Sequence, residues 1–253
     1  MNGIILSALI SIHNEEAQLA DCLQRLSFAD EIVVVLDKCT DGSKAIAEKY
    51  TDQVHEGSWT LEGERRNAAI ALCHGAWVFE VDADERVPQE LANELRRTVE
   101  STSYDWHEIL VDNYIGGKLV RWGWGASFGK AAYPGLFRRG VKVWGAQRVH
   151  PSLQWSGKKG PMLTHRLEHY VDRNISDMIK RLDNYSSARA RDLRDAGETW
   201  GSTASNVRRL FSRFFKCYIS RKGYREGGYG LLIALFAGLY PLISHLKAKL
   251  EED

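Results

Sequence analysis

The chain has 253 residues, of which 44% are hydrophobic and 26% charged, with 34 basic and 33 acidic side chains. This composition is that of a globular protein with a sizeable core, and a formal net charge of +1 argues against a dedicated nucleic-acid binder. The four cysteines form no C-x-x-C pair, so they suggest neither a zinc site nor a disulfide framework, and a reducing compartment fits best. The apolar residues 4–12 lack a basic flank and a cleavage site, so we interpret them as a buried strand rather than a signal peptide.

Short β-rich runs and amphipathic segments alternate over the first hundred residues. The pattern predicts strands at 4–12, 31–36 and 76–81, and helices at 15–26, 41–50, 62–73 and 89–100. This order is typical of an α/β domain with a parallel sheet covered on both faces. Such sheets bind ligands at the carboxyl ends of their strands. We therefore expect the chemistry in the turns that follow these strands, at His13, at Asp37 and at Asp82–Asp84.

The second half of the chain has a different pattern. From Tyr104 to about Thr164 the sequence predicts short strands with many Gly and Trp residues. A long amphipathic helix follows. Its apolar residues have helical spacing, and we interpret them all as core contacts: Ile175, Met178, Ile179, Leu182 and Tyr185.

The C-terminal part is locally basic. Between Ser205 and Arg225 the chain carries seven basic residues and no acid, and residues 227–244 are then uncharged. This uncharged run is shorter than the roughly 20 residues of a spanning helix and contains Pro241. Basic residues beside an apolar segment are typical of an interfacial helix on an anionic membrane. A helix packed on the domain core is the alternative, and the charge cluster favours the membrane surface.

The strongest chemical signal is an apolar strand that ends in three acids within four residues, Asp82, Asp84 and Glu85. Carboxylates this close repel one another unless a cation lies between them. Mg²⁺ or Mn²⁺ bound by one or two carboxylates completes its shell with water and substrate phosphates, which indicates a diphosphate site. The alternative is a solvated turn in which Asp84 or Glu85 caps the helix that begins near Pro88.

Two further signals are Asp37, which follows the second predicted strand, and Arg66, which lies near the start of the third predicted helix. Asp37 can accept hydrogen bonds from a ribose or a base imide. In the same loop, Asp41 is better explained as a helix N-cap. Arg66 could bind a phosphate in bidentate fashion, whereas for Arg65 a surface ion pair is equally plausible.

These segments together resemble family 2 glycosyltransferases with the GT-A fold. In the first half, the resemblance rests on residues 11–16, 29–43, 66–67 and 81–86. Residues 136–139, 149–150, 165–170 and 215–250 are similar to the branch that adds sugars to the lipopolysaccharide core. The resemblance therefore covers nearly the whole chain.

The resemblance implies an inverting enzyme that moves a hexose from a nucleoside diphosphate sugar, usually UDP-linked, to a hydroxyl of a lipid-linked glycan. It places Ser11, His13 and Asp37 around the nucleoside, Arg66 near the diphosphate, and Asp82 with Asp84 at the ribose, the metal and the phosphates. Mn²⁺ or Mg²⁺ is the implied cofactor. It would stabilise the negative charge that develops on the departing nucleotide.

The sequence departs from the family at two positions. Leu36 stands where many members have an acid before Asp37, and Pro151 stands where related transferases often carry Glu after the His of the Val-His motif. That Glu is a candidate for the base that deprotonates the acceptor, which an inverting displacement needs. His150 and Asp112 are the remaining candidates for the base, and the choice between them stays open.

Aromatic side chains are dense where an acceptor is expected to bind. Trp122 and Trp124 are the candidates, because indole rings stack on the apolar C–H faces of sugars. Packing in the core and in turns is the alternative. Trp124 lies between two glycines, and we expect it to be exposed.

The resulting prediction is a Rossmann-like GT-A domain with a mostly parallel sheet over residues 1–170, followed by C-terminal amphipathic helices at 171–253 that associate with the membrane. Residues 1–100 form the nucleotide-sugar half and 101–170 the acceptor half. The enzyme is expected to be cytoplasmic and peripheral on the inner face of the cytoplasmic membrane. The lipopolysaccharide core is the first choice of acceptor, and a capsule, an exopolysaccharide or a polyprenyl phosphate remains possible.

Two other classes of protein are alternatives. A nucleotidyltransferase is disfavoured because residues 13–16, His-Asn-Glu-Glu, stand where its Gly-rich basic phosphate loop is expected. A catalytically silent nucleotide-binding partner subunit is the second alternative, and Leu36 and Pro151 motivate it.

Overall fold

The computed structural model describes residues 5–125, 129–145, 152–197 and 201–251. It divides into two compact units. The sheet unit comprises Met1–Val111 and Ala132–His169, and the helical unit comprises Asp112–Ala131 and Tyr170–Asp253. Strands β6 (Trp106–Ile115) and β11 (Arg166–Asp172) begin in the sheet unit and end in the helical unit. Residues 112–131, which we had assigned to the acceptor half, group with the C-terminal helices.

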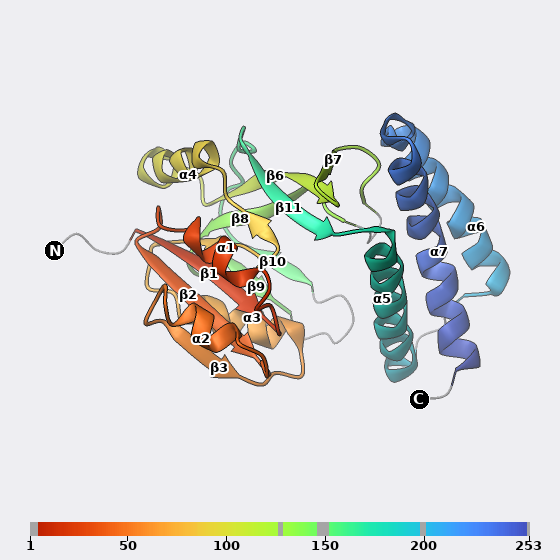
Figure 1. The fold of residues 1–253 in the computed structure, drawn as a ribbon, viewed down its shortest axis with the longest axis horizontal. Helices are drawn as coiled ribbons and strands as arrows, with labels where there is room; N and C mark the ends of the chain where they lie inside the picture. Colours follow the sequence, from red (N-terminus) through yellow and green to blue (C-terminus); the bar gives the residue numbers. More distant parts are fainter. Residues whose placement is uncertain (1–4, 126–128, 146–151, 198–200, 252–253) are drawn as a thin grey trace. The chain divides into compact units, whose positions relative to one another are not determined.

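The first hundred residues have the predicted α/β order, which confirms the fold class. The elements are β1 (Leu6–Ile12), α1 (Leu19–Gln24), β2 (Glu31–Asp37), α2 (Ser43–Ala47), β3 (Val54–Gly57), α3 (Glu62–Ala71), β4 (Trp77–Glu80), β5 (Glu85–Arg86) and α4 (Gln89–Ser101). β1 pairs in parallel with β2 and β4, and β2 pairs in parallel with β3 (Figure 1).

The later strands extend this sheet in the antiparallel sense. They are β7 (Lys118–Val120) and β8 (Ala132–Arg138), together with β6 and β11, and the strand order is β3-β2-β1-β4-β8-β6-β11-β5 with β7 on β6. β8 is antiparallel to β4 and β6, and β5 is antiparallel to β11. β9 (Lys142–Trp144) and β10 (Leu153–Trp155) form a separate antiparallel pair.

Alternate residues of the central strands face two different cores. Ala8 and Ile10 of β1 pack with leucines of α1 and α4, whereas Leu9 packs with Ala69 and Ile70 of α3 on the other face. This alternation follows from the two-residue period of a strand. It also explains why these strands read as continuous apolar runs, since both faces are buried.

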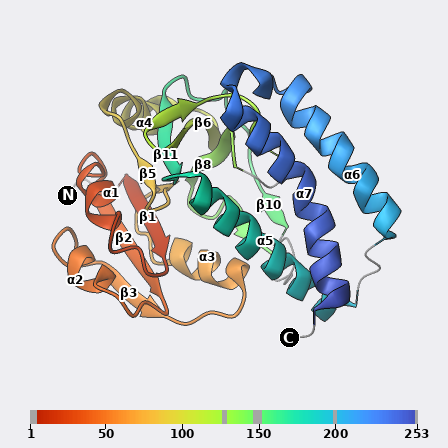
Figure 2. The same ribbon diagram turned by 45° about the vertical axis from the view of Figure 1, so that its right-hand side comes forward.

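The helical unit is a group of helices around α7 (Gly228–Leu250). Its other elements are α5 (Ile175–Ala196), α6 (Thr203–Phe215), the π-helix η1 (Lys216–Ser220) and the 3₁₀-helix η2 (Gly223–Glu226). Figures 1 and 2 both show α7 between α5 and α6. Gly230 allows α7 to approach η2, because a Cβ there would lie 1.8 Å from the carbonyl oxygen of Gly223.

Most of the uncharged run at 227–244 forms α7. Among the described residues, α7 is long and apolar enough to span a bilayer by length and composition, and 44% of its most apolar window is buried inside the structure. Ile233, Ala234 and Ala237 are fully buried, and they pack in one core with Met178 and Leu182 of α5. Much of the apolar character of α7 is therefore used in packing between helices.

The prediction that all five apolar residues of α5 are core contacts was wrong for three of them. Met178 and Leu182 are buried, but Ile175, Ile179 and Tyr185 are 47%, 53% and 48% exposed. The buried positions recur every four residues from Met178 to Ala190, and Ile175 and Ile179 form the adjacent row. Helical spacing predicts a helix but does not tell which of two adjacent rows a neighbouring helix covers.

Glu94 of α4 holds the segment before β11. Its carboxylate accepts hydrogen bonds from the backbone N–H of Thr164 and His165, each at 2.8 Å, and from the Thr164 hydroxyl at 2.7 Å. Burial acts to raise the pKa of Glu94, but these donors and the His165 side chain outweigh it and hold the pKa below its usual value. The resulting stability is present above the usual pKa of Glu and is lost as the pH falls through the lower pKa of the folded state.

We predict that Glu94→Gln lowers the free energy of unfolding by about 1–3 kcal/mol at pH 7, because an amide cannot accept all of these bonds. The loss should shrink as the pH falls from about 4.3, the usual pKa of Glu and so that of the unfolded chain, through the lower pKa of Glu94 in the folded state. Urea denaturation at several pH values measures both effects. Glu90→Gln, at an exposed position of the same helix, is the matched control, and an equal loss in both variants would contradict the prediction.

Candidate active site

The carboxyl ends of β1, β2 and β4 bring the predicted donor-site residues to one edge of the sheet. The three strands are parallel, with Ile12 opposite Leu36 and Leu9 opposite Glu80. Parallel strands end at the same edge. The turns that contain His13 and Asp82 therefore begin there, and Asp37 is the last residue of β2.

The turns after β1 and β2 bind one another and carry backbone strain. His13 Nδ1 lies 2.7 Å from the carbonyl oxygen of Asp37, and the side-chain oxygen of Asn14 accepts a bond of 2.8 Å from the Thr40 N–H. Asn14 and Lys38 have φ angles of +56° and +53°, which residues other than glycine rarely adopt. Such strain persists where the surroundings fix it, and it is common at functional sites.

Ser11 offers a hydrogen-bonding group to a ligand. Its hydroxyl is buried near the end of β1 and has no hydrogen-bond partner within the structure. A buried polar group without a partner is costly, so a buried hydroxyl is normally bonded to protein, water or ligand. This supports its predicted place in a nucleoside site.

Asp37 is paired with Arg65. Its Oδ2 lies 3.2 Å from Nη1 of Arg65, and its Oδ1 accepts a bond of 3.2 Å from the N–H of Trp59. The expected ion pair of Arg65 exists, but it is not on the surface, since only 21% of the Arg65 side chain and 14% of the Asp37 side chain are exposed. The prediction that Asp41 is the N-cap of the next helix was wrong, because the N-cap of α2 is Gly42. Asp41 lies one residue earlier, and its carboxylate accepts a hydrogen bond from the N–H of Ser43 at the start of α2.

Arg66 belongs to a buried group of charges that the sequence reasoning missed. It donates to Glu62 at 2.9 Å, lies 3.9 Å from Oε1 of Glu80, and places its guanidinium carbon 4.9 Å from the Trp144 ring centre. Lys142 of β9 forms an ion pair with the other oxygen of Glu80. Burial opposes the charge on Arg66, but Glu80, Asp82 and Glu62 outweigh it and raise the pKa of the guanidinium.

Lys142 lies in an aromatic environment. Its side chain is 3% exposed, and its Nζ lies 4.8 Å, 5.1 Å and 5.5 Å from the ring centres of Phe137, Trp144 and Trp155. Burial lowers the pKa of the ammonium, and the contact with Glu80 opposes this. A sequence signal for this pair existed in Glu80 itself, an acid in the apolar strand Trp77–Glu80, because a buried carboxylate needs a cation.

The acids after β4 form a tight turn with a histidine beside it. The Asp82 N–H donates to the Glu85 carboxylate at 2.8 Å, and the Glu85 N–H donates to the Asp82 carbonyl at 3.0 Å. Glu85 is opposite His169 in the β5–β11 pair. This pairing places Nε2 of His169 3.1 Å from Oδ2 of Asp84, a contact that the sequence reasoning did not predict.

The alternative interpretation of these acids as helix caps was wrong. The N-cap of α4 is Pro88, with no side-chain cap, and Glu85 is fully buried in β5. Strand pairing with β11 continues the chain through Glu85 before the helix begins, so neither Asp84 nor Glu85 is placed to cap it.

This edge of the sheet fits a divalent cation. Burial raises the pKa of Glu15, and Asp84, Asp82 and Asp41 raise it further, which reflects a local excess of negative charge. The carboxylates of Asp82 and Asp84 are oxygen ligands of the kind that Mn²⁺ and Mg²⁺ accept. In the part of the chain that the structure describes, no three His, Cys, Asp or Glu side chains are arranged to enclose a metal. Further ligands would therefore come from substrate and water.

The two predicted acceptor residues, Trp122 and Trp124, have different environments. Trp124 is 3% exposed and its indole N–H donates to the Val120 carbonyl, so the expectation that it is exposed was wrong. Glycine gives the indole room to pack, since a Cβ at Gly129 would lie 2.2 Å from its ring. Trp122 is half-buried, with Lys222 Nζ and the Arg225 guanidinium carbon 5.3 Å and 5.0 Å from its ring centre.

Asp112 is held by Arg121 within the helical unit. The two bonds, Nε to Oδ1 and Nη2 to Oδ2, are 2.9 Å and 2.7 Å long. The guanidinium therefore occupies both carboxylate oxygens in a bidentate contact. His150, the other candidate base, lies outside the described residues.

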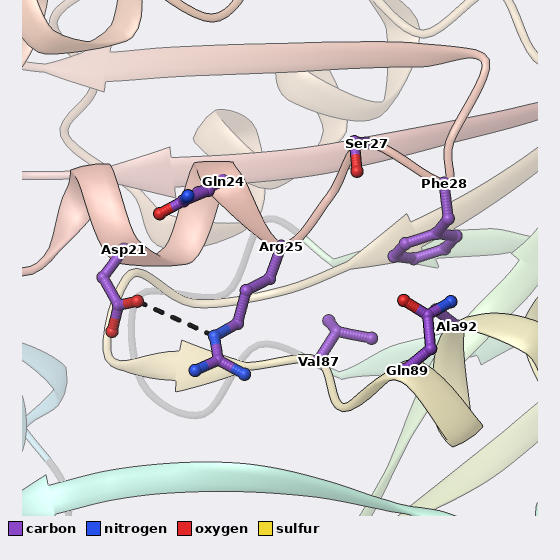
Figure 3. A pocket seen from close by; sticks show the side chains of 8 residues that line it. All are labelled: Asp21, Gln24, Arg25, Ser27, Phe28, Val87, Gln89 and Ala92. Atoms are coloured by element: carbon purple, nitrogen blue, oxygen red, sulfur yellow. Dashed lines mark ion pairs between the residues drawn. The ribbon is translucent and has the colours of Figure 1, made fainter.

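The structure also has an open pocket of about 490 Å³. Its walls come from α1, the turn after it and the start of α4, and Figure 3 shows the ion pair between Asp21 and Arg25, 3.7 Å apart, at its side. None of the predicted donor-site residues lines it. The pocket therefore adds nothing to the chemistry described above.

Comparisons with known proteins agree with the resemblance seen in the sequence. The Glycosyl transferase family 2 model matches residues 7–127. The lipopolysaccharide core biosynthesis glycosyltransferase LpsC of Rhizobium meliloti (strain 1021) is 25% identical over 259 residues, which cover 96% of this chain and 91% of LpsC. An uncharacterized glycosyltransferase of Rickettsia bellii (strain RML369-C) is 30% identical over 240 residues, with 88% and 78% coverage.

Two solved structures also show similarity. S. aureus TarS 1-349 in complex with UDP matches with a TM-score of 0.49 and 12% identity, over 97% of this chain and 90% of that chain. Glucosyl-3-phosphoglycerate synthase from Mycobacterium tuberculosis, in complex with Mn²⁺ and UDP-glucose, matches with a TM-score of 0.36 and 20% identity, over 46% of this chain and 45% of that chain.

We predict that Lys142→Met lowers the free energy of unfolding by about 3–5 kcal/mol, because it leaves the Glu80 carboxylate buried without its closest cation. Urea denaturation of the purified variant measures the change. The double variant Glu80→Met with Lys142→Met should recover much of the loss, since it removes both charges.

Lys159→Met is the matched control for this experiment. Lys159 also pairs with an acid, Glu108 at 2.9 Å, and lies over a Trp ring, but its side chain is 47% exposed. Its loss should cost less than about 1 kcal/mol. Equal effects of the two single variants would show that the buried pair has no special weight.

Proposed function

Because the chain belongs to glycosyl transferase family 2, we propose that it moves a hexose, with inversion, from a nucleoside diphosphate sugar to a hydroxyl of a lipid-linked glycan. UDP is the first choice of nucleotide, and the lipopolysaccharide core is the first choice of acceptor. The observation that carries the proposal is the acidic turn after β4, where Asp84 lies 3.1 Å from His169. Beside it, Glu80 and then Asp82 raise the pKa of the Arg66 guanidinium against the effect of burial.

The nucleoside is proposed to bind at the ends of β1 and β2. Ser11 has a buried hydroxyl without a partner, and the loop bond between His13 and the Asp37 carbonyl fixes the imidazole. Asp37 can still accept from a ribose or base N–H, because a carboxylate has more acceptor sites than the two that Arg65 and Trp59 occupy.

The diphosphate is proposed to bind at Arg66 and the acidic turn. Asp82 and Asp84 would supply carboxylate ligands to Mn²⁺ or Mg²⁺, with substrate and water completing the shell, and the ion when bound supplies Lewis-acid stabilisation of the leaving diphosphate. Arg66 can donate to phosphate oxygens, and Glu62, Glu80 and the Trp144 ring fix its orientation. A fixed donor aimed at developing charge needs no reorganisation during the reaction.

The acceptor class rests on the similarity to LpsC, whose name assigns it to lipopolysaccharide core biosynthesis. Inversion by a single displacement needs a base within hydrogen-bond reach of the acceptor hydroxyl. His150 is the proposed base, since Arg121 occupies both oxygens of Asp112. Trp122, which is half-buried, is the proposed stacking surface for a sugar, and Trp124 is buried in the core.

A lipid-linked acceptor places the enzyme at a membrane. We propose that it is cytoplasmic and peripheral on the inner face of the cytoplasmic membrane, held there in part by the basic residues between Ser205 and Arg225. Retention at the surface raises the effective concentration of acceptor around the enzyme.

The test of this function is a calorimetric titration of the whole chain with UDP, GDP and dTDP, each with and without Mn²⁺. We expect one nucleotide to bind in a metal-dependent manner, and Asp84→Asn to lose this dependence together with about a hundredfold or more of sugar transfer. The control is Asp52→Asn, which also replaces a carboxylate with an amide but at an exposed position before β3. It should behave as the wild type.

Two outcomes of this titration would contradict the proposal. Binding of none of the three nucleotides would argue against a nucleotide-sugar donor. Metal-dependent binding without sugar transfer or donor hydrolysis would instead support a catalytically silent partner subunit.

A further inference from the structure

The helices α6 and η1 carry an exposed apolar row that the proposed chemistry does not use. Its members recur every four residues and are 38%, 56%, 56% and 54% exposed: Val207, Phe211, Phe215 and Ile219. We call these four residues the α6 row. An isolated exposed apolar residue is normal, but a continuous exposed row that includes two phenylalanines marks an interaction surface.

The α6 row is not the face by which α6 packs in the protein. Asn206 and Cys217 are buried, and the backbone of Leu210 approaches α7 so closely that a Cβ at Gly238 would lie 2.7 Å from the Leu210 oxygen. These positions lie on a different side of the helix from Phe211 and Phe215. The helix therefore has an apolar surface besides the one that its own fold buries.

The row next to it is cationic and polar. Arg208, Ser212, Lys216 and Ser220 each follow a member of the α6 row by one residue, and all four are exposed. No acid occurs between Ser205 and Arg225. An apolar row with cations beside it matches a bilayer surface, where phenylalanine enters the acyl boundary and Arg and Lys contact anionic headgroups.

We propose that the α6 row docks on an anionic lipid bilayer, with Phe211 and Phe215 inserted and with Arg208 and Lys216 at the headgroup phosphates. The proposal rests on the proposed function only in taking a lipid surface as the partner. It moves the apolar membrane contact from residues 227–244, where the sequence had suggested it, to α6, because α7 uses much of its apolar surface for packing.

The test is co-sedimentation of the full chain with vesicles of phosphatidylcholine alone and of phosphatidylcholine with phosphatidylglycerol. We expect the wild type to bind the anionic vesicles and to be released by salt. Phe211→Ser with Phe215→Ser should lower the partition coefficient at least about tenfold, because two apolar side chains no longer enter the bilayer. Arg208→Glu with Lys216→Glu should abolish the preference for phosphatidylglycerol.

The matched control is Ile175→Ser with Ile179→Ser. These residues of α5 are 47% and 53% exposed and are also spaced by four, but α5 lies on the other side of α7 (Figure 2). Vesicle binding by this variant should equal that of the wild type. An unchanged thermal melt of each variant shows that the fold is intact.

Three outcomes would overturn the proposal: wild-type binding by the double Phe variant, an equal loss in the α5 control, or a wild-type dimer in light scattering that the double Phe variant converts to monomer. The last would make the α6 row a contact between two copies of the chain. The result of this test does not depend on the proposed function. Asp84→Asn should keep vesicle binding, and the double Phe variant should keep the nucleotide binding that the wild type shows in solution.

Discussion

The buried carboxylate of Glu80 is the charge on which the arrangement of the candidate site depends. It ends β4 with a side chain only 11% exposed, and two cations from elsewhere in the chain neutralise it, Arg66 of α3 and Lys142 of β9. An unpaired charge at this depth would be prohibitive, so the three elements must come together. Asn67 strengthens the junction, because its side-chain amide exchanges two hydrogen bonds with the Trp144 backbone, at 2.8 Å and 2.9 Å.

This arrangement fixes Arg66 near the acids that follow β4. Arg86 is buried near them, but it donates to the carbonyls of Ala83 and Glu85 and so braces the turn itself. Burial and then the nearby Asp84, Asp82 and Asp41 raise the pKa of Glu15, which reflects the acids that gather at this edge. A cation and the diphosphate that it carries would complete the balance there.

The parts of this site that the sequence predicted are those with local signals. An apolar run that ends in acids gives both the strand and its functional end, which is why Asp37, Asp82 and Asp84 could be found. His169 and Lys142 are 85 and 62 residues from their partners Asp84 and Glu80, and only strand pairing and packing bring them there. The prediction for Trp124 failed for another reason: flanking glycines suggest exposure, yet the nearby Gly129 makes room for the indole ring to pack.

The C-terminal helices show the same distinction between composition and exposure. Composition places the apolar character in α7, the uncharged segment, but a helix between two others buries much of such a surface. α6 is rich in arginine and so reads as a polar helix, although Phe211 and Phe215 are each 56% exposed. Only apolar residues that the fold leaves exposed can contact a bilayer. The packing of α6 on α7 determines which residues these are, and the sequence of neither helix shows it alone.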